Sequence, residues 1–88
     1  MAIDSKYGRV TLEHGHIGED EPVVVFRATD ALLPKVLAYY HLFCVKAGSP
    51  RRHLDLILNA RDRVVEWQSR NPTRTPNSDA SRVWLADD

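Results

Sequence analysis

Two stretches of the chain repeat apolar residues at intervals of three and four, and a short continuous apolar run precedes them. The first stretch, Ala31 to Ala47, predicts a helix because its apolar side chains share one face. Thr29 or Asp30 is a suitable N-cap for this helix. Pro34 falls in the first turn, where proline is tolerated, and Gly48 supplies a C-terminal stop.

The second stretch, Pro50 to Arg70, predicts another helix. Ser49 is a good capping residue, and Pro50 then occupies the favoured first helical position. Because only Gly48 and Ser49 separate the two stretches, we expect the helices to pack as an antiparallel hairpin.

The segment ahead of the helices, Lys6 to Ala28, predicts a β-hairpin. Its expected strands are Arg9–Leu12 and Pro22–Ala28, and the second contains three valines and a phenylalanine in a row. Glycines and an acidic run mark the connection between them. The expected fold class is therefore α+β, with an N-terminal β-hairpin followed by an antiparallel helical hairpin.

Residues Asn71 to Asp88 are rich in proline, threonine, asparagine and serine, which predicts an irregular C-terminal tail. Val83-Trp84-Leu85 is its one apolar part, and we expect it to dock on another surface. The predicted organisation is one domain over residues 1–70 and a tail over residues 71–88.

The apolar content of the first helix exceeds what a chain of 88 residues can cover. Leu32, Tyr39 and Leu42 lie off its main apolar stripe, so the helix is greasy over more than half of its circumference. The chain has one cysteine, Cys44, so no disulfide within the chain enlarges its small core. We therefore expect a homo-oligomer.

Net charge and hydropathy bear on whether the protein binds nucleic acid or a membrane. Twelve basic and 12 acidic residues cancel, whereas nucleic-acid-binding proteins usually carry a basic excess. No apolar run reaches membrane-spanning length, and the N-terminus has no apolar signal region. A cytoplasmic location, without membrane association and without nucleic acid as the main partner, is the expectation.

Arg51, Arg52 and His53 form the most informative polar cluster. They occupy the first turn of the second predicted helix, where the helix dipole already makes the potential positive. Two arginines there cost a few tenths of a kcal/mol each, roughly, unless an anion reverses the sign. The alternative is that both arginines point to water or pair with the acidic run.

Further cations precede the first helix. Arg27 ends the stronger predicted strand, and Thr29 follows it, so a guanidinium, a hydroxyl and backbone N–H groups are expected at one junction. An ion pair of Arg27 with Asp30 or with a glutamate is the competing interpretation. Tyr7 and Arg9 add a ring and a cation near the N-terminus.

Arg61 falls on the apolar stripe of the second helix, seven residues after Leu54. A charge there extends to water, finds a carboxylate such as Asp30 or Asp55, or faces a ligand cavity. Of these, a stripe-edge arginine with a covered stem is the simplest interpretation.

Motifs for catalysis are missing from the sequence. There is no glycine-rich phosphate loop, nucleophile elbow or metalloprotease helix. His14 and His16 alternate as two metal ligands would, but no third ligand accompanies them. Cys44 lies on an apolar face without a neighbouring base. We expect no enzymatic activity, no metal and no cofactor.

Four segments resemble small proteins encoded by bacteriophages: YGRVTLEHG (Tyr7–Gly15), DEPVVVFRATD (Asp20–Asp30), AGSPRRHLDLI (Ala47–Ile57) and VVEWQ (Val64–Gln68). A ribbon followed by a helical hairpin also resembles phage anti-defence sponges, which counter the CBASS and Thoeris systems by sequestering cyclic nucleotides or cyclic ADP-ribose isomers. The resemblance implies oligomers with ligand pockets between subunits. It implies that Arg27, Thr29, Arg51, Arg52 and His53 line such a pocket.

The expected function is therefore sequestration of a phosphorylated nucleotide-type signal by a homo-oligomer in the cytoplasm of the infected bacterium. One rival is a DNA-binding regulator, because residues Lys46 to Arg52 resemble the turn and recognition-helix start of a helix-turn-helix. Helices of about 17 and 20 residues are long for that motif. The other rival is a protein-binding inhibitor or virion component that uses the apolar excess of the first helix.

Overall fold

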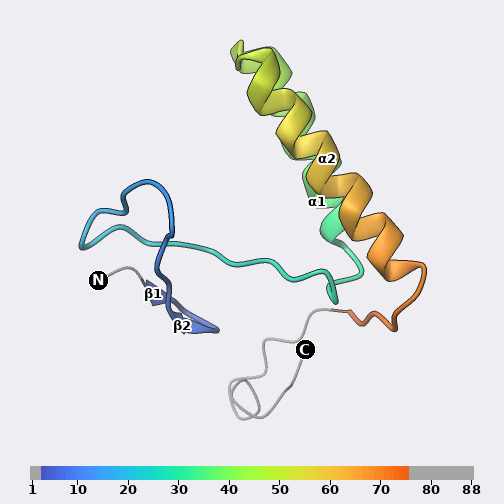
Figure 1. The fold of residues 1–88 in the computed structure, drawn as a ribbon, viewed down its shortest axis with the longest axis horizontal. Helices are drawn as coiled ribbons and strands as arrows, with labels where there is room; N and C mark the ends of the chain where they lie inside the picture. Colours follow the sequence, from blue (N-terminus) through green and yellow to red (C-terminus); the bar gives the residue numbers. More distant parts are fainter. Residues whose placement is uncertain (1–2, 76–88) are drawn as a thin grey trace. The chain divides into compact units, whose positions relative to one another are not determined.

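The computed structural model describes residues 3–75 of the chain. In sequence order these residues form strands β1 (Ile3–Asp4) and β2 (Gly8–Arg9) and helices α1 (Leu33–Ala47) and α2 (Arg51–Gln68) (Figure 1). The described residues divide into two compact units, 3–26 and 27–75. An N-terminal antiparallel hairpin followed by two antiparallel helices confirms the expected α+β class.

The N-terminal unit is organised around one buried carboxylate. The strands β1 and β2 pair antiparallel, with Asp4 opposite Gly8. Asp4 Oδ1 accepts hydrogen bonds from the backbone N–H groups of Lys6 and Tyr7, both at 2.8 Å, and so closes the turn between the strands. Asp4 Oδ2 accepts the N–H of Val25 at 2.7 Å. A single side chain therefore fixes both the turn and a segment far along the sequence.

The predicted strand positions are wrong. The hairpin lies earlier than expected, and residues Pro22–Ala28 do not pair as a strand. Val24 and Phe26 are exposed, whereas Val23 and Val25 are half-buried. A valine-rich run suits a half-covered extended surface, but pairing requires a neighbouring backbone. Here the Asp4 carboxylate takes the Val25 N–H instead.

The helix α1 begins two residues later than predicted. The N-cap is Leu32 and not Thr29 or Asp30, so that expectation is corrected. The Asp30 side chain instead holds the turn before the helix, because its Oδ1 accepts the N–H of Leu32 at 2.8 Å. Pro34 stands in the first turn, as expected. The predicted stop is confirmed, because Gly48 adopts φ 81° and its N–H reaches the carbonyl of Val45 at 3.1 Å.

The helix α2 begins one residue later than the sequence predicts. Pro50, rather than Ser49, stands at the N-cap in extended conformation, with φ −60° and ψ 149°. Its carbonyl accepts the N–H groups of His53 and Leu54 at 3.0 and 3.1 Å. The Ser49 side chain makes no capping hydrogen bond, so that expectation is corrected.

The core between the helices is small. Among the described residues the buried apolar side chains are Leu33, Cys44 and Ile57. At the open end of the hairpin, the Gln68 side-chain amide donates to the carbonyls of Ala28 and Asp30 at 3.0 and 2.9 Å. This double hydrogen bond joins the end of α2 to the start of α1.

A short backbone bridge extends the helical unit past α2. The Arg74 N–H donates to the Thr29 carbonyl at 2.9 Å, and the Ala31 N–H donates to the Arg74 carbonyl at 3.0 Å. Residues 69–75 are otherwise irregular. The rest of the predicted tail, including Val83–Leu85, lies outside the described residues.

Candidate functional site

The residues expected to bind a ligand lie at separate places. Tyr7 and Arg9 belong to the N-terminal unit, and the others belong to the helical unit. Within the helical unit, Arg27 and Thr29 precede α1, whereas Arg51 begins α2 at the far end of the hairpin (Figure 1). Because α1 has 15 residues, these two groups lie roughly 22 Å apart at 1.5 Å per residue. One chain does not bring them into a single pocket.

The start of α2 combines exposed cations with an aromatic pair. Arg51 Nε lies 3.9 Å from Asp55 Oδ2, and its side chain is 91 % exposed, so water screens this pair strongly. The His53 ring meets the Tyr40 ring edge to face, with centroids 6.1 Å apart and planes at 86°. A hydrogen bond with Cys44 raises the pKa of Tyr40, which favours its neutral phenol. The two rings therefore form an aromatic pair near the start of α2.

The junction before α1 is rigid but offers fewer N–H groups than expected. The N–H of Asp30 donates to the Arg27 carbonyl at 3.0 Å, and the N–H of Ala31 donates to the Arg74 carbonyl. The N–H of Leu32 donates to the Asp30 side chain. The expected contribution of backbone N–H groups to an anion site is thus corrected, because they bond within the chain. The side chains of this junction that the sequence predicts to bind a ligand are those of Arg27 and Thr29.

Arg61 lies at the edge of the apolar face of α2 and is partly exposed. Its guanidinium lies 3.4 Å from Asp62 Oδ1, and its side chain is 38 % exposed. The suggested partner Asp55 lies instead beside Arg51. This partial exposure matches the simplest interpretation of Arg61, in which the aliphatic part of the side chain is covered and the guanidinium reaches water.

The N-terminal unit places Tyr7 and Arg9 in different surroundings. The Lys6 ammonium lies 5.3 Å from the centre of the Tyr7 ring, a cation–π distance. Arg9 lines a small groove of about 280 Å³ together with His16 and Glu19. A ligand that used the Tyr7 ring would therefore compete with Lys6.

The Asp4 carboxylate supports the Tyr7 backbone. The N–H of Tyr7 lowers the pKa of Asp4 below its usual value. Burial acts in the opposite direction, and the N–H groups of Val25 and Lys6 add to the lowering. Asp4 is therefore ionised at neutral pH, and its charge holds the turn.

A groove along the outer side of α2 was not foreseen. It has a volume of about 660 Å³, with the half-buried Trp67 as its aromatic wall and Arg63 and Arg70 as its cations. The other lining residues are Ala28, Asn59, Ala60, Asp62, Val64 and Glu66. Trp67 lies one residue before the end of α2 and is half-buried. Ala60 lies seven residues before Trp67, on the same side of the helix, and its small side chain leaves room for the groove. This small residue is the sign of a groove that the sequence contains.

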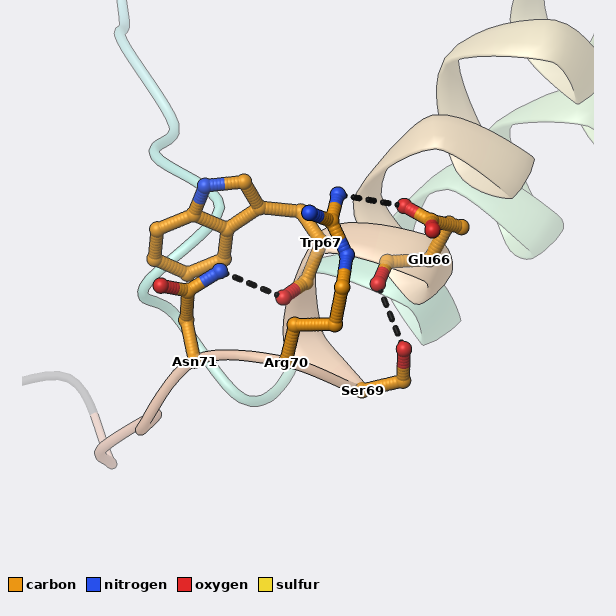
Figure 2. A network of polar contacts seen from close by, with 5 residues as sticks. All are labelled: Glu66, Trp67, Ser69, Arg70 and Asn71. Carbon is orange, nitrogen blue, oxygen red and sulfur yellow. Dashed lines mark hydrogen bonds and ion pairs between the residues drawn. The ribbon is translucent and has the colours of Figure 1, made fainter.

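Polar contacts fix the far end of this groove (Figure 2). Arg70 Nη2 lies 2.7 Å from Glu66 Oε2, and the Ser69 hydroxyl donates to the Glu66 carbonyl at 2.6 Å. The Asn71 amide donates to the Trp67 carbonyl at 2.9 Å. The guanidinium of Arg70 is thus paired with a carboxylate, and the negative charge of Glu66 makes Arg70 a weaker binder of anions.

The apolar excess that the sequence predicts for the first helix lies partly in an uncovered stripe on α1. Leu32, Val36, Tyr39 and Phe43 repeat at helical spacing, and their exposed fractions are 48, 38, 63 and 61 %. We call these four residues the α1 stripe. Tyr40, at its edge, connects the stripe to His53 and so to the start of α2.

The chain matches no protein-family model, no curated protein and no solved structure. Its function must be inferred from its own residues. Neither described helix combines the length and the apolar character that crossing a bilayer requires. Across residues 3–75, no three His, Cys, Asp or Glu side chains gather in a way that would hold a metal ion.

The arrangement suits binding. The start of α2 offers cations and two rings, and the junction before α1 offers one guanidinium on a rigid base. Cys44, the thiol among the described residues, is buried between the helices. Guanidinium groups form charge-assisted hydrogen bonds with anions, and aromatic rings interact with cations and with other rings.

Proposed function

We propose that the protein is a phage anti-defence protein that binds and sequesters a cyclic nucleotide or cyclic ADP-ribose-type immune signal without turnover. The observation that carries the proposal is the exposed start of α2, where Arg51 and Arg52 precede His53, whose ring contacts the Tyr40 ring edge to face. Guanidinium groups bind phosphates with charge-assisted hydrogen bonds, and rings stack on bases. The resemblance of a ribbon followed by a helical hairpin to phage anti-defence sponges suggests the class of ligand.

The separation of the two cationic groups favours a homo-oligomer. Arg27 and Arg51 stand at opposite ends of one helical hairpin, so a pocket that uses both requires two copies. Sequestration needs tight binding at stoichiometric protein concentrations and no chemical step. A pocket shared by two subunits encloses more of the ligand than either surface does alone.

The helical geometry disfavours the DNA-binding rival. The helices of a helix-turn-helix cross at about 90–120°. Here α1 and α2, with 15 and 18 residues, run antiparallel along each other. Arg51 and Arg52 therefore stand at the tip of a long hairpin, which lacks the crossed second helix that supports a recognition helix in the major groove.

Calorimetry against cyclic dinucleotides, cyclic trinucleotides and cyclic ADP-ribose isomers tests the function. We expect tight binding of one class, and chromatography of the heat-released ligand should recover it unchanged. A hydrolysed product would make the protein an enzyme. No binding across the set, combined with salt-sensitive binding to duplex DNA, would favour the regulator.

Arg27→Ala tests the role of the junction. If Arg27 makes a charge-assisted phosphate contact, its loss weakens binding by about 1.5–3 kcal/mol, the usual magnitude for such hydrogen bonds. Arg63→Ala, on the outer side of α2, is the matched control and should leave affinity unchanged. Equal affinities of the Arg27→Ala variant and the unsubstituted protein would remove Arg27 from the site.

A further inference from the structure

The α1 stripe leaves a substantial apolar area exposed. Tyr39 and Phe43 are each more than three-fifths exposed, and Leu32 and Val36 add aliphatic surface. Together the four side chains present on the order of 400 Å² of mainly apolar area, comparable to the largest patch on a typical monomer. A stable interface buries about 800 Å² per partner, so the stripe supplies the centre of one. The exposed side chains beside it, which include Tyr40 and Leu42, supply the rest.

The spacing of the stripe is symmetric about its midpoint. Leu32 lies as far before the midpoint as Phe43 lies after it, and Val36 and Tyr39 are likewise equidistant. All four positions fall within about 60° around the helix at 100° per residue. A second copy laid antiparallel would therefore place each large ring against a smaller aliphatic side chain, which lets the two rows interdigitate.

We propose that the α1 stripe is the interface between two copies of this chain, related by a two-fold axis with their α1 helices antiparallel. Tyr39 then packs against the partner's Val36, and Phe43 packs against the partner's Leu32. A two-fold interface uses the same surface on both subunits, so a stripe that is complementary to its own reverse is the pattern such an interface needs.

Charge decides between antiparallel and parallel pairing. The helix α1 carries Lys35 and Lys46 but no acidic residue, and Arg51 and Arg52 follow at the same end as Lys46. Parallel helices would place the two Lys46 ends side by side and repel each other. The antiparallel arrangement separates these ends by the length of α1 and lets Lys46 approach the partner's Asp30. It also aligns the two helix dipoles favourably.

The pairing also brings together the cationic groups that one chain keeps apart. With the two-fold axis at the stripe midpoint, the end that holds Arg27 and Thr29 meets the end of the partner that begins with Arg51. An anion between them would relieve the repulsion of these cations. This last step rests on the proposed function, whereas the pairing itself does not.

Site-directed cross-linking tests the pairing and its direction. In a Cys44→Ala background, a cysteine at Tyr39 lies about three residues, or ~4.5 Å along the axis, from its symmetry mate. A cysteine at Phe43 lies about eleven residues, or ~16 Å, from its mate. We expect oxidation to cross-link the Y39C chain efficiently and the F43C chain hardly at all. Each variant must first retain the helical circular dichroism of the Cys44→Ala protein.

Other outcomes would overturn the inference. Equal cross-linking at both positions would mean that the helices are parallel, and no cross-linking at either would mean that the stripe does not meet its own copy. Tyr39→Glu with Phe43→Glu should turn the assembly into helical monomers in sedimentation, because the charges fall on the interface. An unchanged assembly would contradict the proposal even if the cysteine variants fold poorly.

The ligand-binding and cross-linking experiments can contradict the proposed function and the proposed interface independently of each other. If cyclic di-AMP and the other cyclic nucleotides do not bind but the Y39C chain cross-links, the proposed function is wrong and the interface stands. If a ligand binds while the Y39C chain stays uncross-linked, the interface is wrong and the function stands.

Discussion

The two units of this chain are held by different forces. In the helical unit, apolar side chains from α1 and α2 pack around Leu33, Cys44 and Ile57, and glycine and proline mark the helix ends. In the N-terminal unit, the Asp4 carboxylate accepts hydrogen bonds from three backbone N–H groups, and these bonds hold the unit in place of an apolar core. The stability of the helical unit comes from contacts among many atoms, whereas that of the N-terminal unit depends on the hydrogen bonds of one side chain. The two units should therefore respond to different perturbations.

The largest effect is expected from Ile57→Ala. Ile57 is buried between the helices, and deleting a buried aliphatic side chain costs about 2–5 kcal/mol. For so small a core this is a large part of the stability, so the melting temperature should fall steeply. Leu56→Ala, one position along on the exposed side, is the control and should cost far less. Similar losses for the two variants would mean that the packing between α1 and α2 does not hold the unit.

Gly48→Ala should have a smaller effect at the turn between the helices. Gly48 has φ 81°, a conformation that disfavours side chains, although the space beside its Cα is open. The cost is therefore backbone strain alone, about 1 kcal/mol. Chemical denaturation measures it. A neutral substitution would show that the left-handed end of α1 relaxes without loss.

Asp4→Asn should affect the N-terminal unit and spare the helices. Asparagine keeps one acceptor oxygen, but its NH₂ group cannot accept the Val25 N–H. Amide exchange at Val25 should become faster, while exchange within α2 stays unchanged. Faster exchange in both units would mean that Asp4 supports the whole chain.

Acid should act on the same unit. Because hydrogen bonds lower the pKa of Asp4 in the folded protein, its contribution is complete above the usual pKa of a carboxyl group. It is lost as the pH falls through the lowered value in the folded state. The Val25 amide should thus lose protection in acid in the unsubstituted protein but not further in the Asp4→Asn variant. Equal acid sensitivity of the two would assign the effect to another group.

The smallest change in stability is expected from Arg51→Glu combined with Arg52→Glu. Acidic side chains in a first helical turn interact favourably with the dipole, by a few tenths of a kcal/mol each, roughly. The melting temperature should stay the same or rise slightly, whereas nucleotide binding should be lost. A large drop in melting temperature would make these arginines structural.

The same contrast explains what the sequence predicts well. Helix periodicity and the Gly48 stop are local signals, so both helices were located to within two residues at each end. Strand pairing depends on distant backbone, and the valine run near Val24 gives no sign that Asp4 binds Val25. Asp4 itself resembles any polar residue near a chain terminus.

The candidate site was partly predictable for a related reason. Arg51 and Arg52 stand out because two cations oppose a helix dipole, and the structure leaves Arg51 exposed. The apolar excess of α1 was visible, but which residues stay uncovered depends on the face that meets α2. The N–H groups before α1 were expected to be available, yet Asp30 and Arg74 pair with them. Contacts between distant segments decide such details.

Native mass spectrometry after incubation with the cyclic nucleotides and cyclic ADP-ribose isomers tests the central claim most directly. The proposed function predicts an assembly of two or more 10.0 kDa chains that carries a nucleotide, and denaturation should release that ligand with its mass unchanged. A ligand-free chain of 10.0 kDa as the main species, at low micromolar protein concentration, would contradict both the sequestration and the assembly.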